Sequence, residues 1–146
     1  MLMMFRRSLA TLVAFACIGV VPPATAAASV QATCTGRDSC LFVADQDYHA
    51  GDCTMFHGAT WTLRPGSLEF HGIVTSSDDH DHWVMQVQLK DAQGVVSATV
   101  LNDSGGGDVF VKYLPDRRDQ YAWDAFGHFD RAKYDGIQSI QVWNQC

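Results

Sequence analysis

The sequence predicts an all-β domain, an antiparallel β-sandwich of about eight short strands braced by disulfides, with a closed β-barrel as the alternative. Short segments that alternate apolar and polar residues follow one another at roughly 8–12-residue spacing, with turn residues between them. Fifteen of the sixteen acidic residues are Asp, which favours turns over helix interiors, and twelve Gly accompany them. These features favour strands and turns over surface helices.

Residues 83–90 give the clearest single strand. Four apolar side chains there alternate with amide and lysine side chains, which predicts an apolar inner face and an amide-lined outer face. We expect further strands at 40–44, 53–63 (interrupted near Gly58), 67–75, 95–101, 109–113, 121–129 and 137–143. A hairpin centred on the acidic turn at 76–81 would pair the strands on either side of it. Asp130 is expected to cap one short helical turn through Tyr134.

The first 26 residues have the pattern of an export signal. Arg6 and Arg7 precede an apolar run from Leu9 to Val21, and Ala24-Thr25-Ala26 is a small-x-small cleavage site. The apolar run is too short to span a bilayer. We therefore expect a signal peptide at 1–26 and a single secreted domain at 27–146.

The composition of residues 27–146 argues against two classes of partner. This part of the chain contains eight basic and sixteen acidic residues, a formal charge of −8. Nucleic acids and anionic membrane surfaces both require a cationic patch, so neither is an expected partner. No second apolar stretch reaches spanning length, so no membrane insertion is expected after signal cleavage.

Four cysteines remain once Cys17 is removed with the signal. An even number in a small exported domain predicts two disulfides, with three possible connectivities. We favour Cys34–Cys40 as a local clip and Cys53–Cys146 as a link between the start and the end of the domain. A zinc site is the less favoured alternative, because no Cys-x-x-Cys pair is present.

Residues 78–82, Asp-Asp-His-Asp-His, hold the densest set of metal-ligand types. On a strand His80 and His82 would face one side and could hold zinc or copper, whereas Asp79 and Asp81 could hold calcium. An exposed polar turn whose carboxylates bond to the backbone is the favoured interpretation. Calcium and zinc remain the less favoured alternatives, and no cofactor is expected.

Several clusters resemble those of a known family. They are 51–55 (Gly-Asp-Cys-Thr-Met), 61–70, 74–79 with Asp81 and Trp83, Lys90-Asp91-Ala92, Leu114-Pro115-Asp116-Arg117, Tyr121-x-Trp123, Gly127-x-Phe129-Asp130 and Cys146. In these stretches the chain is similar to a family of small exported actinobacterial proteins classified as a domain of unknown function. The resemblance runs from about Gly51 to Cys146, implies one compact domain and supports the Cys53–Cys146 pairing. It implies no activity, and Cys34 and Cys40 lie outside it.

The aromatic residues favour a binding function. Trp143 falls out of phase with its apolar neighbours, and Arg117, Arg118 and Tyr121 form a basic spot on an acidic chain, so these four residues are candidates for a binding surface. The favoured function is non-catalytic binding of an extracellular protein or carbohydrate, and no catalytic residue is assigned.

Two other functions remain open. A small secreted hydrolase using Asp, Glu and His predicts a pocket around Glu69, His71 and His128. An extracellular protease inhibitor predicts a rigid protruding loop such as residues 102–108, which three successive glycines disfavour.

Overall fold

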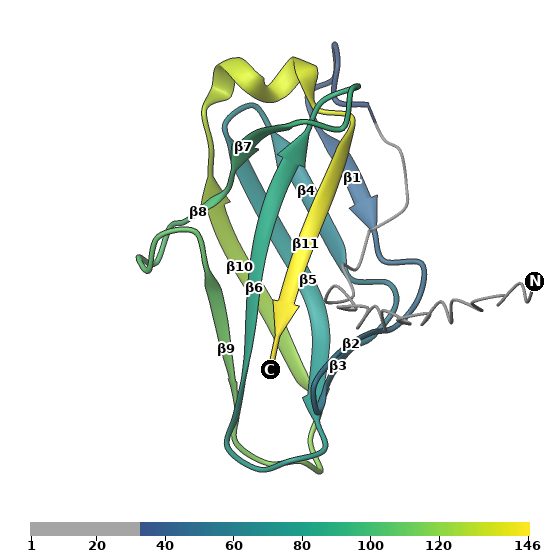
Figure 1. Cartoon of the computed structure of the whole chain (residues 1–146), viewed down its shortest axis with the longest axis vertical. Coiled ribbons are helices and arrows are strands. Elements are labelled where there is room, and N and C mark those ends of the chain that lie inside the picture. Colours follow the sequence, from purple (N-terminus) through teal and green to yellow (C-terminus); the bar gives the residue numbers. More distant parts are fainter. Residues whose placement is uncertain (1–32) are drawn as a thin grey trace, which may run out of the picture.

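The computed structural model describes residues 33–146. The expected signal peptide at 1–26 and the domain start at 27 lie outside the described residues. Two antiparallel sheets pack face to face in the described part of the chain, without closing into a barrel (Figure 1). The predicted all-β sandwich is confirmed, with eleven strands in place of about eight.

The larger sheet contains seven strands: β1 (Cys40–Val43), β2 (Tyr48–Ala50), β3 (Cys53–Met55), β4 (Thr60–Arg64), β5 (Ser67–Ser76), β8 (Leu101–Asn102) and β10 (Tyr121–His128). The smaller sheet contains four: β6 (Asp81–Lys90), β7 (Val96–Thr99), β9 (Phe110–Leu114) and β11 (Ser139–Gln145). The order in the larger sheet is β1-β4-β5-β10-β8, with β3 also paired to β5 and β2 to β3. In the smaller sheet β6 pairs with β11 on one side and with β7 and β9 on the other.

The core lies between the sheets because β5 and β6 alternate strictly along their ten residues each. Every second side chain of each strand is buried. In the larger sheet the ring of Phe70 lies 5.2 Å from Trp61 and 5.1 Å from Trp123. Trp83 of β6 is fully buried in the opposite layer. Both layers therefore contribute large aromatic side chains to the core.

The strand count differs from the prediction at three places. The predicted strand at 53–63 is divided into β3 and β4 at Gly58, whose φ of 85° interrupts the extended backbone. The predicted strand at 95–101 is also divided, because β7 belongs to the smaller sheet and β8 to the larger one. The short β2 has no counterpart in the prediction.

The expected hairpin between β5 and β6 is wrong. β5 pairs with β3, β4 and β10, whereas β6 pairs with β7, β9 and β11. The connection between them carries the chain from one sheet to the other. This crossing brings two apolar faces together, whereas a hairpin would place both on the same side of one sheet.

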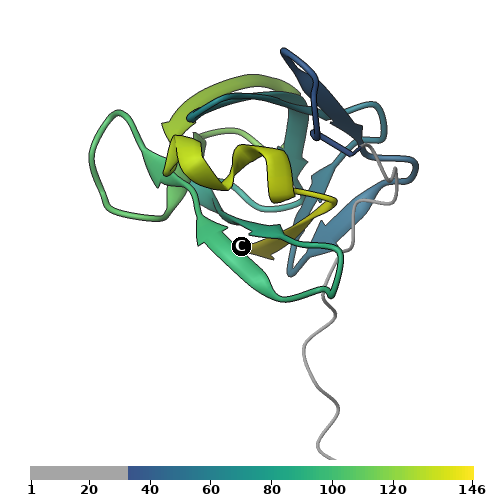
Figure 2. The ribbon, with the colours of Figure 1, turned by 90° about the horizontal axis from the view of Figure 1, so that it is seen from above.

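One end of the sandwich is covered by the 3₁₀ segment η1 (Arg131–Gly136) (Figure 2). Asp130 begins it as predicted, because its carboxylate accepts a hydrogen bond of 2.9 Å from the Ala132 amide. Tyr134 and Ile137 are buried at this end, and burial raises the pKa of the Tyr134 hydroxyl. No helix among residues 33–146 has the length and apolar character needed to cross a membrane.

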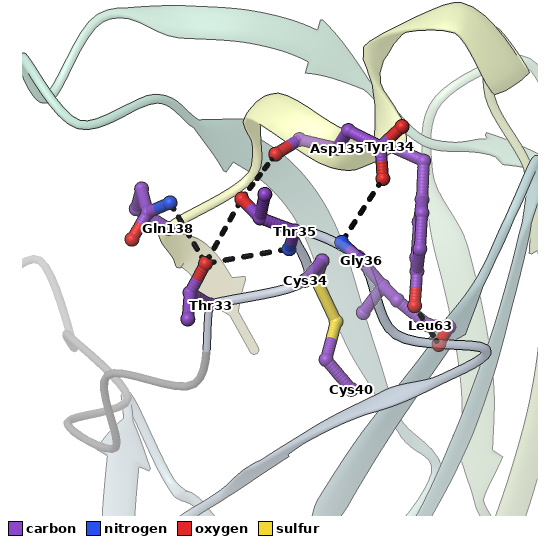
Figure 3. The surroundings of a disulfide bond; sticks show 9 residues. All are labelled: Thr33, Cys34, Thr35, Gly36, Cys40, Leu63, Tyr134, Asp135 and Gln138. Atoms are coloured by element: carbon purple, nitrogen blue, oxygen red, sulfur yellow. Dashed lines mark hydrogen bonds between the residues drawn. A yellow bond between two sulfur atoms is a disulfide. The ribbon is translucent and has the colours of Figure 1, made fainter.

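The disulfide Cys34–Cys40 clips the first described loop onto this covered end (Figure 3). Thr35 Oγ1 donates a hydrogen bond of 2.6 Å to the Asp135 carbonyl, and Gln138 Nε2 donates one of 2.9 Å to Thr33 Oγ1. The clip therefore holds a loop that also bonds to η1 and to the residues after it.

The second disulfide, Cys53–Cys146, joins the two sheets. Cys53 begins β3 of the larger sheet, and Cys146 follows β11 of the smaller one, 93 residues later. Both bridges have the pairing that the sequence analysis favoured. Two disulfides in so small a domain indicate an oxidising environment.

Removal of the two bridges is expected to have unequal effects on stability. By loop entropy, Cys53→Ser with Cys146→Ser should lower the free energy of unfolding by about 4–5 kcal/mol, and Cys34→Ser with Cys40→Ser by about 2 kcal/mol. Urea denaturation followed by tryptophan fluorescence measures both. An equal or larger loss on removing the short bridge would contradict the assignment of Cys53–Cys146 as the main brace.

Candidate functional site

The outer face of the smaller sheet carries amide and aromatic side chains on two paired strands. Trp143 of β11 lies opposite Gln86 of β6, and Gln145 lies opposite Val84. Residues opposite each other in an antiparallel pair place their side chains on the same face and in contact range. The strand register thus gathers these four residues on one surface.

An open groove of about 420 Å³ lies on this surface. Val84, Gln86, Val109, Trp143, Asn144 and Gln145 line it. This volume falls within the range of small-molecule binding sites. None of the lining side chains carries a charge, so the groove combines apolar and neutral polar groups.

Hydrogen bonds orient the polar side chains at the groove. Gln86 Nε2 donates to Asp108 Oδ2 at 2.6 Å, which links β6 to the loop before β9. The indole N–H of Trp143 donates to Gln88 Oε1 at 3.4 Å. Trp143 is 38% exposed, so part of its ring remains open to solvent at the groove.

Asn144 connects the groove to the core. The indole N–H of buried Trp83 donates to Asn144 Oδ1 at 2.9 Å. Because an indole nitrogen only donates, this bond fixes which end of the Asn144 amide faces Trp83. Asn144 Nδ2 is then a buried donor with no hydrogen-bond partner among the described residues. Such donors are rare in folded proteins. Asn144 lies opposite buried Met85, so its side chain faces the core and not the open side of the groove.

Apolar surface continues from the groove along β9. Val111 lies opposite Val84, and Tyr113 lies opposite His82 with ring centroids 4.9 Å apart. Val111 and Tyr113 are both about half exposed. The outer face of the smaller sheet therefore has an uncharged strip that extends beyond the groove itself.

Arg117, Arg118 and Tyr121 do not share this surface with Trp143. Both arginines lie in the turn after β9, where Arg118 Nε donates to Asp116 Oδ1 at 2.9 Å. The hydrogen bond from the Arg118 side chain holds the pKa of the Asp116 carboxyl well below its usual value and raises the pKa of the guanidinium. The Tyr121 hydroxyl donates to the Asp116 carbonyl at 3.0 Å. These contacts hold the turn in place.

The side chains of Asp79 and Asp81 bond to separate partners, whereas His80 and His82 share one. Asp79 accepts a hydrogen bond of 3.0 Å from the Arg117 amide, and the Asp81 carboxylate accepts one from the Ser76 hydroxyl. His80 precedes β6 with a φ of 64°, and its Nδ1 lies 2.6 Å from the Tyr113 hydroxyl. His80 is therefore not on the strand that carries His82, although both rings contact Tyr113.

Asp81 also lies beside the long disulfide. Its carboxylate and the sulfurs of Cys53 and Cys146 fall within 4.8 Å of one another, the only such group of three His, Cys, Asp or Glu ligand atoms in the part of the chain that the structure describes. Because the two sulfurs are joined to each other, neither is a thiolate ligand.

The residues named for a hydrolase lie on the outer face of the larger sheet. Glu69 pairs with Arg64 at 3.3 Å, and His71 pairs with Asp124 at 2.6 Å. His128, at the end of β10, pairs with Asp103. His71 lines a small hollow whose other walls contain neither Glu69 nor His128.

The loop considered for protease inhibition, residues 102–108, has three successive glycines with positive φ at Gly105, Gly106 and Gly107. Glycine adopts this region without steric cost but also keeps the most conformational freedom. The loop ends at Asp108, whose carboxylate accepts a hydrogen bond from Gln86 beside the groove.

Comparison with known proteins identifies a family without an assigned activity. The model of a family of unknown function (DUF6294) matches residues 60–146, which is more than half of the chain. No curated protein and no solved structure matches the chain. The chemistry of the site must therefore be argued from its own residues.

Trp143 and the amide-lined face of residues 83–90 are both recognisable in the sequence. The sequence does not show that they lie side by side on one surface. The pairing of β11 with β6 places Trp143 opposite Gln86. The sequence predicts a loop that ends at Asp108 and a strand that begins at Val109, but no local pattern places these residues beside β6. A search for the outward-facing residues of both strands would have found four of the six groove residues.

Two tryptophans on adjacent strands should differ in their contribution to stability. Trp83→Ala should lower the free energy of unfolding by about 3–5 kcal/mol, because it empties a fully buried site. Trp143→Ala should lower it by less than about 1 kcal/mol, because that ring lies on the surface. Chemical denaturation followed by circular dichroism compares the two. A large loss of unfolding free energy in Trp143→Ala would mean that the ring stabilises the fold and does not act as a surface binding residue.

Proposed function

We propose that this chain, which belongs to the family of unknown function (DUF6294), is an exported, non-catalytic domain that binds a neutral carbohydrate in the groove on the outer face of its smaller sheet. The single observation that carries the proposal is the half-open Trp143 ring beside uncharged amides in a groove of about 420 Å³. The family assignment contributes no activity.

The chemistry of the groove matches that of a sugar ring. A pyranose presents one face rich in C–H groups, which packs on an aromatic ring, and a rim of hydroxyls that both donate and accept hydrogen bonds. Trp143 offers the ring, and Gln86 and Gln145 offer amide donors and acceptors.

The absence of charge on the lining side chains favours a neutral ligand over an ionic one. Phosphate, sulfate and carboxylate ligands are usually held by Arg or Lys, and the groove lining contains neither. A typical protein interface involves about 20–30 residues on each side, whereas six residues line the groove. A short glycan is the occupant that best fits both the size and the chemistry.

The same lining supports a binding role without catalysis. Hydrolysis of a glycosidic bond ordinarily requires two carboxyl groups on either side of the bond. Among the groove-lining residues no side chain titrates near neutral pH. The Asp108 carboxylate beside the groove accepts a hydrogen bond of 2.6 Å from Gln86.

Export is part of the proposal. The signal-like residues 1–26 and the two disulfides both fit a protein that works outside the cytoplasm. Extracellular glycans would then be available to the groove.

The direct test is a screen of neutral oligosaccharides against the oxidised protein, followed by calorimetry on the best ligand. Trp143→Ala should weaken binding at least about tenfold, close to 1.4 kcal/mol. Phe126→Ala removes an aromatic ring that is exposed on the opposite sheet and should leave the affinity unchanged.

The ionic strength provides a second criterion. Binding of a neutral ligand should change little between low and high salt, because no ion pair is formed. Binding that survives Trp143→Ala, or that is restricted to anionic glycans or to a protein partner, would overturn the proposal.

A further inference from the structure

Two histidines that the groove does not use line a second, smaller hollow. His57 lies in the connecting segment 56–59, between β3 and β4, and His71 lies on β5. Both line a hollow of about 110 Å³ on the outer face of the larger sheet. This hollow is separate from the carbohydrate groove, which lies on the other sheet.

The backbone brings these two segments together. At the start of the connecting segment, the Phe56 amide donates to the Ile73 carbonyl at 3.0 Å. Directly after the segment, Thr60 of β4 pairs with His71. The connecting segment also packs closely on β5. A Cβ added at Gly72 would lie only 3.1 Å from the Ala59 side chain. Glycine at position 72 thus allows the close approach of the segment that carries His57.

Each imidazole is held by a carboxylate on the same nitrogen. His57 Nδ1 lies 2.8 Å from Asp47 Oδ1, and His71 Nδ1 lies 2.6 Å from Asp124 Oδ1. In a neutral ring this contact keeps the proton on Nδ1 and leaves the lone pair on Nε2. This carboxylate–histidine arrangement is the one that orients histidine ligands in metal sites.

Asp47 is fixed more firmly than a surface carboxylate usually is. Its Oδ1 also accepts a hydrogen bond of 2.7 Å from the His57 backbone amide. This backbone bond, together with the side-chain bond from the His57 ring, lowers the pKa of the Asp47 carboxyl. The two hydrogen bonds to Asp47 Oδ1, from the His57 backbone amide and from its ring, keep the imidazole in one orientation.

We propose that His57 and His71 bind a divalent transition-metal ion through their Nε2 atoms, with water completing the coordination. Imidazole suits zinc, copper and nickel, whereas calcium takes oxygen ligands. The side chains of His57 and His71 are 73% and 60% exposed, which leaves room for water ligands. Asp47 and Asp124 act as positioning residues through the two rings.

Zinc titration of the oxidised protein by calorimetry tests the site. We expect one zinc ion per chain at neutral pH, and loss of this uptake in both His57→Ala and His71→Ala. Asp47→Asn and Asp124→Asn should weaken zinc binding by about 10–100-fold while leaving both histidines in place. Circular dichroism of each variant verifies that the fold is retained.

The third histidine–aspartate pair provides the matched control. His128 Nδ1 lies 2.5 Å from Asp103 Oδ1, but His128 does not line the hollow. His128→Ala should therefore bind zinc like the unaltered chain. A copper(II) electron paramagnetic resonance spectrum should show two coordinated nitrogens, and one after either histidine in the hollow is removed.

Three results would overturn the proposal: no zinc uptake, uptake unchanged in His57→Ala or His71→Ala, or uptake lost in His80→Ala with both hollow histidines present. The last result would assign the metal to the acidic turn at 78–82. None of these variants should change the affinity for carbohydrate at Trp143. The metal proposal can therefore be rejected without rejecting the carbohydrate proposal.

Discussion

Burial of the alternating apolar faces of β5 and β6 against each other is the constraint on which the rest of the structure depends. Each of these strands places every second side chain in the core. The chain therefore crosses between sheets after Ser76, and the polar halves of both strands turn outward. Gln86 of β6 then lines the groove on the smaller sheet, and His71 of β5 lies at the proposed metal site.

The long disulfide links this core to the groove. Cys146 directly follows Asn144 and Gln145, two of the groove-lining residues, and its partner Cys53 belongs to the opposite sheet. The bridge thus limits the motion of the chain end that forms one wall. The Trp83–Asn144 hydrogen bond adds a second restraint from the core. Stability and the shape of the groove depend here on the same few contacts.

The sequence predicts the layers of this protein better than its sites, for a physical reason. Alternation is local, so Trp83 is correctly expected in the core and Trp143 outside it. Strand pairing is not local. The expected β5–β6 hairpin is wrong, because the choice between pairing and crossing depends on where both apolar faces are buried.

The same reason explains the sites. His71 faces Asp124 only because β5 pairs with β10 in one register, and Trp143 faces Gln86 only because β11 pairs with β6. His57 and Asp47 lie ten residues apart and meet across loops that no periodic pattern places. A shift of one residue in any of these registers would move the side chain to the opposite face.

The central claim is that the proposed carbohydrate ligand binds to the outer face of the smaller sheet and not to that of the larger sheet. Nuclear magnetic resonance of the labelled protein, titrated with the neutral oligosaccharide that binds best, tests it most directly. The side-chain signals of Gln86, Gln145 and the Trp143 indole should shift together, with those of Phe126 and His71 unchanged. Shifts confined to the larger sheet, or none at the groove under saturating ligand, would contradict the claim.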